Sequence, residues 1–317
     1  MKVVIPGGTG QVGTVLARAL RGDGHEAVVL TRRSGGEGQV YWDGERLGAW
    51  VREMDGSDVV INLAGRSVSC RYTKGNLTEM MRSRVRSARV VGQAIAAASR
   101  PPRAWLQMST ATIYAHTYDA PNDEVAGVIG GSEDGVPGYW GFSVDIAQAW
   151  ERELDEANVP ATRKVALRAA MVMTPDNGGV FDVLSRMARL GLGGPVGGGR
   201  QYVSWIHEDD FTAAVRFILD HDSLAGPVNL AAPGPVRQRD LMRELRAAWG
   251  VPAGLPATRW MAELGAFAIR TDTELLLKSR RVVPGLLTAA GFEFRHGTWP
   301  EAARDLVQRA RRRPPGR

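Results

Sequence analysis

Short apolar runs alternate with longer amphipathic stretches through the first half of the chain, and this pattern predicts the order of its elements. Apolar runs predict strands, and stretches with apolar residues at helical spacing predict helices. The expected strands are 2–5, 26–31, 58–63, 103–108 and 163–169, and the expected helices are 11–21, 77–99 and 141–158. The strands lack polar alternation, which is typical of parallel strands buried on both faces. We therefore predict an α/β fold with a doubly wound parallel sheet.

The pattern becomes less regular after about residue 174. Another helix is expected to end near residue 221, and a last strand is expected at 228–230. Beyond 235 the chain is mainly helical and is interrupted by prolines. We expect a large domain over 1–174, to which segments around 200–232 return. A smaller, mainly helical lobe on the substrate side should cover 175–310, and 311–317 should be a disordered Arg/Pro tail.

The composition is that of a globular protein, with 44% hydrophobic and 23% charged residues among 317. The net charge is +6, but residues 304–317 contain six arginines and one aspartate, so most of it belongs to the tail. We therefore expect no nucleic-acid binding. No apolar run is long enough to span a membrane. The single cysteine, Cys70, cannot form an internal disulfide, which favours a reducing cytoplasm.

A glycine-rich turn follows the first expected strand and precedes the first helix. Gly7, Gly10 and Gly13 give the spacing G-x-x-G-x-x-G, which permits a tight turn and a close backbone approach to a pyrophosphate. The helix N-terminus then faces the phosphates with unpaired N–H groups. A purely structural turn is the alternative. We predict a dinucleotide site in a Rossmann domain, with contacts from Gly7, Thr9, Gly10, Gln11, Val12 and Gly13.

The residues after the second expected strand indicate which dinucleotide binds. NAD sites usually place an acidic residue there to accept from the ribose 2′-hydroxyl. This chain instead has Arg32 and Arg33, with no acidic residue before Glu37. Guanidinium groups suit a 2′-phosphate, so we predict NADP rather than NAD. The alternative is two solvated arginines in an arginine-rich protein.

Several further motifs occur in a characteristic order. They are Asn62-Leu63-Ala64-Gly65, Ser83-Arg84, Ser109-Thr110-Ala111-Thr112-Ile113-Tyr114, Ala149-Trp150-Glu151, Arg168, Ser204-Trp205-Ile206-His207, Asn229-Leu230-Ala231-Ala232-Pro233, Arg281-Val282-Val283-Pro284 and Gly291-Phe292-Glu293-Phe294. With the glycine turn, they resemble the extended short-chain dehydrogenase/reductases, in particular the NAD-dependent epimerase/dehydratase group. The chain is most similar to an epimerase-like subfamily, once described as cell-division inhibitors, that has a small C-terminal domain.

The resemblance implies roles for residues at two strand ends. Leu63, Ala64 and Gly65 would pass close to the cofactor, although a simple strand-to-loop turn would also explain them. Thr110 would hydrogen-bond a substrate oxygen beside the nicotinamide, with Ser109 adjacent. Either hydroxyl could instead cap a backbone turn. Arg168 is also expected among the cofactor-binding residues.

The chain departs from this superfamily at the catalytic Tyr-x-x-x-Lys pair, in which the lysine lowers the pKa of the tyrosine. Tyr114 is followed four residues later by Tyr118, and Tyr139 by Ser143. Both tyrosines are more simply explained as packing residues than as proton donors. Arg84 could replace the pair by polarising a carbonyl or binding an anionic substrate, or it could be an outward helix charge.

A run of possible metal ligands, His207, Glu208, Asp209 and Asp210, stands at the start of a predicted helix. Adjacent residues there point in different directions, and acidic residues in a first turn stabilise a helix. We therefore expect no metal site.

These observations leave two hypotheses of different class. The first is a cytoplasmic NADP-dependent oxidoreductase or epimerase that acts on a small carbonyl or sugar-like substrate, with Thr110 and Arg84 as catalytic residues. The second is a catalytically silent NADP-binding sensor or scaffold. The absent Tyr-x-x-x-Lys pair favours the second, whereas Thr110 and Arg84 favour the first.

Overall fold

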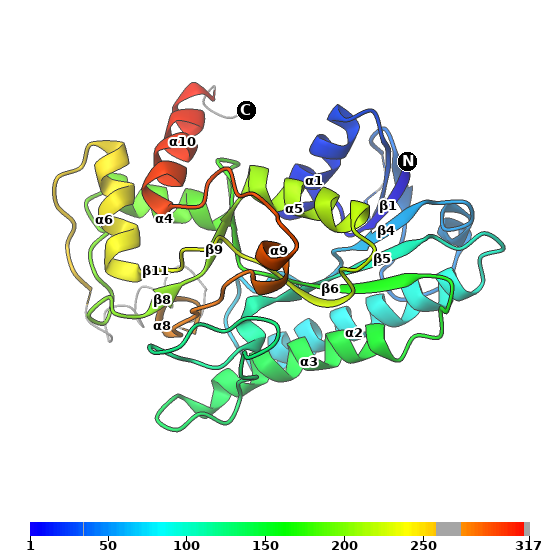
Figure 1. Ribbon diagram of the computed structural model, residues 1–317, viewed down its shortest axis with the longest axis horizontal. Coiled ribbons are helices and arrows are strands. Elements are labelled where there is room, and N and C mark those ends of the chain that lie inside the picture. Colours follow the sequence, from blue (N-terminus) through cyan, green and yellow to red (C-terminus); the bar gives the residue numbers. More distant parts are fainter. Residues whose placement is uncertain (34, 258–273, 314–317) are drawn as a thin grey trace.

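Seven parallel strands form the central sheet of the protein, in the order β10-β6-β5-β4-β1-β2-β3 (Figure 1). The computed structural model describes residues 1–33, 35–257 and 274–313. The strands are β1 (Lys2–Pro6), β2 (Glu26–Thr31), β3 (Gln39–Tyr41), β4 (Val59–Asn62), β5 (Ala104–Thr110), β6 (Arg163–Ala169) and β10 (Gly226–Leu230). From β1 the sheet grows in both directions, through β2 on one side and β4 on the other. Ligands of doubly wound folds bind at this reversal of strand order. The predicted fold class is confirmed.

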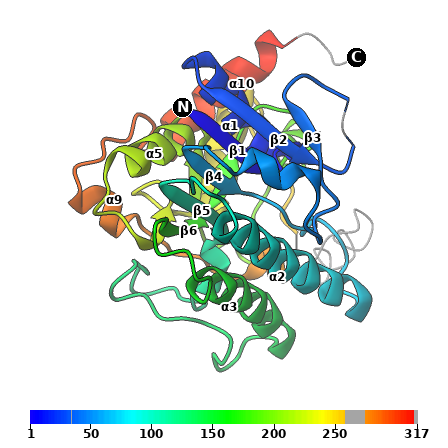
Figure 2. The same ribbon diagram turned by 90° about the vertical axis from the view of Figure 1, so that its right-hand side faces the viewer.

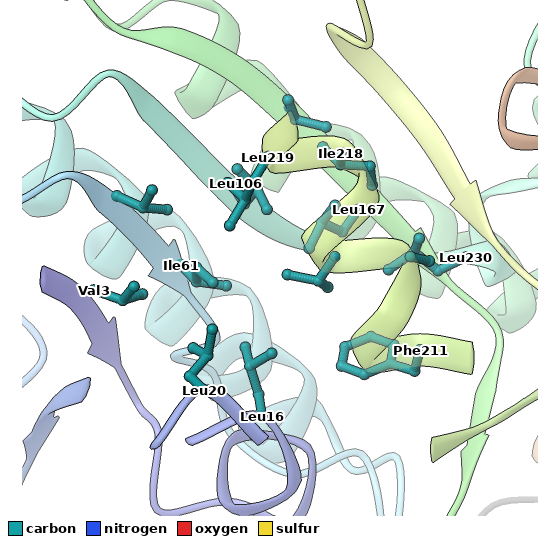
Figure 3. Packing of buried hydrophobic residues seen from close by; sticks show 14 of the residues in the cluster. Val3, Leu16, Leu20, Ile61, Leu106, Leu167, Phe211, Ile218, Leu219 and Leu230 are labelled. Atoms are coloured by element: carbon teal, nitrogen blue, oxygen red, sulfur yellow. The ribbon is translucent and has the colours of Figure 1, made fainter. Parts of the chain in front are cut away.

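Helices cover both faces of the sheet (Figure 2). The helices on one face are α1 (Gln11–Gly22) and α5 (Glu208–Asp220), and those on the other are α2 (Lys74–Ala96) and α3 (Gly141–Asp155). Consecutive strand residues point to opposite faces: Val3 packs with the α1 and α5 side, and Val4 with the α2 and α3 side. Figure 3 shows the first core, where Leu16 and Phe211 meet the strands. Burial on both faces explains the continuous apolar runs.

A smaller lobe follows β6 in the chain. Its strands are β7 (Met171–Met173), paired with β9 (Trp205–His207), and β8 (Tyr202–Val203), paired with β11 (Val236–Arg237). Its helices are α4 (Val180–Arg189), α6 (Gln238–Trp249), α8 (Glu274–Leu277), α9 (Gly285–Ala289) and α10 (Trp299–Arg312). Helices α4, α6 and α10 share one apolar core that includes the buried Trp205 and Trp299. Three short 3-10 helices complete the described elements: Ala49–Glu53, Ala111–Ile113 and Gly138–Trp140.

Two predicted boundaries need correction. Helix α2 starts at Lys74 rather than 77, because the Thr73 side chain accepts a hydrogen bond from the Asn76 N–H and caps the helix. The tail was expected to begin at 311, but α10 continues to Arg312 and Arg311 contacts the carbonyls that end α6. Residues 314–317 lie outside the described residues. Among those described, no helix combines the length and apolar character that crossing a membrane requires.

Candidate functional site

The glycine turn lies directly against the end of β4. Gly7 has a φ of +76°, and a Cβ added there would come 2.7 Å from the Ala64 Cα. A Cβ at Gly13 would similarly collide with the backbone of Gly8. These two glycines are therefore required by the left-handed conformation at Gly7 and by the close packing of α1 on the turn. The fold thus brings the Gly7 turn and Leu63–Gly65, which are far apart in sequence, to one place.

The N-terminus of α1 has features of an anion site. Its N-cap is Gly10, which offers no side-chain cap, and its first turn contains no acidic residue. The first N–H groups therefore keep the positive end of the helix dipole. The Gln11 side chain lies against Gly179, and its buried Nε2 has no hydrogen-bond partner among the described residues. Gln11 thus adds a buried donor near these N–H groups.

Two arginines follow β2 beside this turn. Arg32 and Arg33 are exposed, and neither has an ion-pair partner within the described ranges. The Arg33 N–H donates to the Thr31 Oγ1, which lies 3.5 Å from the Thr9 Oγ1. Both guanidinium groups thus remain available to a ligand phosphate.

Arg84 turns inward, unlike its neighbours on α2. Its outward neighbours pair with carboxylates, namely Arg82 with Glu79, Arg86 with Glu45 and Arg89 with Glu153. Arg84 instead lies over Gly65, where an added Cβ would come 3.2 Å from its Cζ, and over the Trp150 ring. Its Nη1 donates to the Met80 carbonyl, and burial lowers its pKa to about 10. In the described part of the chain no carboxylate lies within ion-pair distance of this cation, which stays protonated at neutral pH.

The two hydroxyls at the end of β5 have different surroundings. The Thr110 Oγ1 accepts from the Thr112 N–H at 3.1 Å and caps the 3-10 helix, which is the alternative that the sequence left open. This bond uses the oxygen as an acceptor, so the Thr110 O–H can still donate. The Ser109 hydroxyl is buried and donates to the Glu151 Oε1 at 2.5 Å.

Ser109 belongs to a set of buried polar residues that we call the closed cluster: Ser109, Tyr114, Glu151, Arg168 and Asn229. Arg168 Nε and Nη2 donate to the two Glu151 oxygens at 2.9 and 2.8 Å. Arg168 Nη1 donates to the Tyr114 hydroxyl, which donates to the Asn229 Oδ1. Burial alone would lower the pKa of Arg168, but Glu151 raises it above its usual value. Every charge in the closed cluster has a partner.

This cluster bears on three interpretations: it differs from the expected roles of Ser109 and Arg168 and agrees with the packing role expected for Tyr114. Ser109 and Arg168 were expected to contact the cofactor, but their side chains bond to Glu151 inside the protein. Tyr114 is 2% exposed, and burial raises its pKa despite Arg168. Its proton is held by Asn229, so Tyr114 is a packing residue here. Glu151 was named only within the Ala149-Trp150-Glu151 motif, although a glutamate on the apolar face of a predicted amphipathic helix was a visible signal.

A second set of polar residues, which we call the open cluster, lies on the other side of the same turn: Thr112, Ser143, Glu274, Lys278 and Arg280. The last three are buried. Ser143 Oγ donates to the Glu274 Oε2 at 2.5 Å. Lys278 Nζ donates to the Thr112 carbonyl at 3.0 Å. Sequence reasoning missed Glu274, Lys278 and Arg280, and their only signal was that Lys278 is one of four lysines.

The hydrogen bonds of His207 identify it as the cap of helix α5 rather than as a metal ligand. His207, His296 and Asp305 offer ligand atoms within 4.8 Å of one another. However, the His207 Nδ1 accepts from the Asp209 N–H at 3.1 Å, so a neutral ring carries its proton on Nε2, which points to the Asp305 Oδ2. That leaves His207 no lone pair for a cation. Arg309 also neutralises Asp305 at 2.6 Å.

The chain is similar to known sequence families and to individual known proteins. Residues 3–131 match the model of the NAD dependent epimerase/dehydratase family, and residues 257–306 match a domain of unknown function, DUF1731. The chain is 31% identical to the mouse protein named "Epimerase family protein SDR39U1", with 97% of this chain and all of that protein covered. It is 33% identical to an epimerase family protein of Mycobacterium leprae, over 95% of this chain and 94% of the relative.

Solved structures give a consistent result. The human epimerase family protein SDR39U1, crystallised with NADPH, matches with a TM-score of 0.83 and 27% identity, covering 97% of this chain and 99% of the other. A UDP-N-acetylglucosamine 4-epimerase from Bacillus cereus matches with a TM-score of 0.72 at 15% identity, over 98% of this chain and 99% of the other, which indicates a shared fold.

Proposed function

Because the chain belongs to the NAD dependent epimerase/dehydratase family, we propose that it binds NADP(H) and is an oxidoreductase or epimerase for a small carbonyl or sugar-like substrate. The observation that carries this proposal is the inward, unpaired guanidinium of Arg84 at Gly65, beside the contact between the glycine turn and Ala64. A half-buried cation without a carboxylate partner carries a desolvation cost that a ligand anion would offset.

Cofactor binding is supported by the turn and by the residues after β2. Gly7, Gly10 and Gly13 permit a pyrophosphate to approach the backbone, and Gln11 and Val12 stand in the first turn of α1. Arg32 and Arg33 would hold the 2′-phosphate, and Thr9 adds a hydroxyl nearby. The human relative with NADPH supports the same cofactor.

Bound NADPH would supply a hydride to a carbonyl carbon, and NADP⁺ would accept one from an alcohol. Thr110 would donate its O–H to the reacting oxygen, since its capping bond uses only the oxygen. Arg84 would place positive charge near Gly65, where negative charge on that oxygen or on the substrate can be stabilised. We also place the protein in the cytoplasm, because its single cysteine suits a reducing compartment.

The silent NADP-binding alternative is supported by a specific observation, the serine at 143. Tyr139 is 46% exposed, and the residue four positions later carries no charge. A protein that binds NADPH but turns over no carbonyl or sugar nucleotide would fit this alternative.

Calorimetric titration with NADPH and NADH tests the cofactor assignment. Charge-assisted contacts contribute about 1.5–3 kcal/mol, so NADPH should bind roughly tenfold or more tightly. The double variant Arg32→Ala, Arg33→Ala should lose this preference, whereas Arg86→Ala, which removes a paired arginine of α2, should keep it. Equal affinities in the wild type would refute the assignment. A panel of carbonyls and sugar nucleotides, followed by NADPH absorbance, then separates enzyme from silent binder.

A further inference from the structure

The residue that stands at the lysine position of helix α3 makes an unexpected long-range contact. Ser143 lies four residues after Tyr139, and its hydroxyl donates to Glu274 in α8, which is 131 residues away in sequence. Glu274 is fully buried. The C-terminal part of the chain therefore reaches directly onto the segment where the expected cation is absent.

A lysine follows one helical turn after this glutamate. Lys278 is 3% exposed, and its Nζ lies 3.9 Å from the Glu274 Oε1. The same Nζ donates to the Thr112 carbonyl. Lys278 therefore brings an ammonium group from the C-terminal region to the turn after β5.

Thr112 connects this ammonium group to Thr110. Its N–H donates to the Thr110 Oγ1 at 3.1 Å, its carbonyl accepts from Lys278, and its Oγ1 accepts from Arg280 Nε at 3.1 Å. All three polar groups of Thr112 are thus engaged. The position of the Thr110 hydroxyl depends on a turn that two cations hold from the other side.

Two cations and two carboxylates meet around Lys278 among the described residues. Arg280 and Lys278 share one buried carboxylate, Glu274, with Arg280 Nη2 3.6 Å from it. Glu133 is the second carboxylate, and its oxygens also accept the N–H groups of His116 and Gly131. Burial, Lys278 and Arg280 lower the pKa of His116, against the effect of Glu133.

A residue whose only role is to hold the Thr112 carbonyl would not need a charge. Burying an ammonium costs free energy that a neutral donor to the same carbonyl would avoid. Burial and Arg280 lower the pKa of Lys278 to about 8, and this lowered pKa reflects the free-energy cost of burying the charged form. A buried ammonium group that donates to the Thr110 turn is useful where negative charge develops nearby.

We propose that Lys278 is a positioning residue of the active site, which supplies from the C-terminal region the ammonium charge that helix α3 lacks after Tyr139. It holds the Thr112 carbonyl, and through it the Thr110 hydroxyl, and it places positive charge beside the reacting oxygen. This inference rests on the proposed function. It makes residues 274–280 part of the site rather than a peripheral addition.

The small number of lysines allows a direct test by NMR without a known substrate. Lysine labelled with ¹³C at Cε should give four signals, from Lys2, Lys74, Lys164 and Lys278. Lys278→Arg identifies the signal of interest. If that variant does not fold, the triple variant Lys2→Arg, Lys74→Arg, Lys164→Arg leaves Lys278 as the only lysine.

Each signal is titrated in the free protein, with NADP⁺ and with NADPH. The oxidised nicotinamide ring is positively charged, so the pKa of Lys278 should be lower with NADP⁺ than with NADPH, by about half a pH unit. Lys164 is the matched control: it also donates to backbone carbonyls, those of Asp155 and Ala157, but at the other end of α3. Its titration should be the same with both cofactor forms.

The outcomes separate the two proposals. Binding of both cofactor forms with an identical Lys278 titration overturns this inference and leaves the proposed function standing. Failure of either form to bind, measured by calorimetry on the same sample, overturns the proposed function and this inference with it. A shift confined to Lys278 supports both.

Discussion

The closed and open clusters lie on two sides of the same turn, Thr110–Tyr114, and both bury charge, but they pair their charges differently. In the closed cluster Glu151 meets Arg168 with two hydrogen bonds, and Tyr114 and Ser109 complete the set. In the open cluster Lys278 and Arg280 share Glu274. Burial of charge therefore does not by itself mark a functional site. The open cluster differs in that one of its cations, Lys278, donates to a backbone carbonyl of this turn, that of Thr112.

Breaking the closed cluster should have the largest effect on stability. Glu151→Gln leaves the Arg168 guanidinium buried without a counter-charge, and removal of one partner of a buried pair costs about 3–5 kcal/mol. Urea unfolding measures this change. The control is Glu153→Gln, which removes the partner of the exposed Arg89 and should cost about 0.5 kcal/mol or less. Equal effects of the two variants would show that the closed cluster is not a buried pair in solution.

Removing the groups that face the proposed substrate should affect turnover instead. Loss of one preorganised donor commonly lowers kcat by about 10²–10³-fold. Thr110→Val and Arg84→Met should each do so on any substrate found, with NADPH affinity within a few-fold of wild type. Arg86→Met, from the outward face of α2, is the control and should leave turnover unchanged. Turnover that survives both changes removes Thr110 and Arg84 from the mechanism.

The open cluster should respond to alkaline pH through Lys278. The folded pKa of Lys278 is about 8, below the unfolded value of 10.5. Between these values the unfolded chain binds more protons, so this residue makes the free energy of unfolding rise with pH. The free energy of unfolding of the wild type, relative to that of Lys278→Met, should therefore rise by on the order of 1–3 kcal/mol from pH 8 to 10.5. A difference independent of pH would contradict the buried ammonium.

The exposed arginines at the C-terminus should contribute least. Arg311 lies over the Trp249 ring and Arg313 pairs with Asp176, both on the surface. Exposed pairs are worth about 1 kcal/mol or less. Deleting residues 311–317 should lower Tm by about 2–4 °C at most. A drop of ten degrees or more in a thermal scan would show that these contacts hold α10 in place.

Local sequence signals were sufficient to predict the cofactor half of the candidate site. The glycine turn needs only a strand, the spacing of Gly7, Gly10 and Gly13 and a helix, all within a few residues. Arg32 and Arg33 follow β2 directly. The position of Thr110 came from the resemblance, and the structure adds that it caps the next turn.

Other assignments depended on which side chains meet across the fold. Whether Arg84 faced inward was undecided, because the four arginines of α2 look alike until Glu79, Glu45 and Glu153 are placed around three of them. Ser109 and Arg168 were assigned to the cofactor from the resemblance, but both side chains bond to Glu151 of α3.

The sequence by itself determined the sheet, the glycine turn and the type of cofactor expected, because periodicity and turn chemistry act over neighbouring residues. Only the tertiary structure decided that Lys278 lies at Thr112, since these residues are 166 positions apart. The two cations, the carboxylate and the serine meet because Glu274 of α8 reaches Ser143 of α3. The role of a buried charge depends on the residues that contact it. Residues that the fold brings together from distant positions leave no local pattern in the sequence.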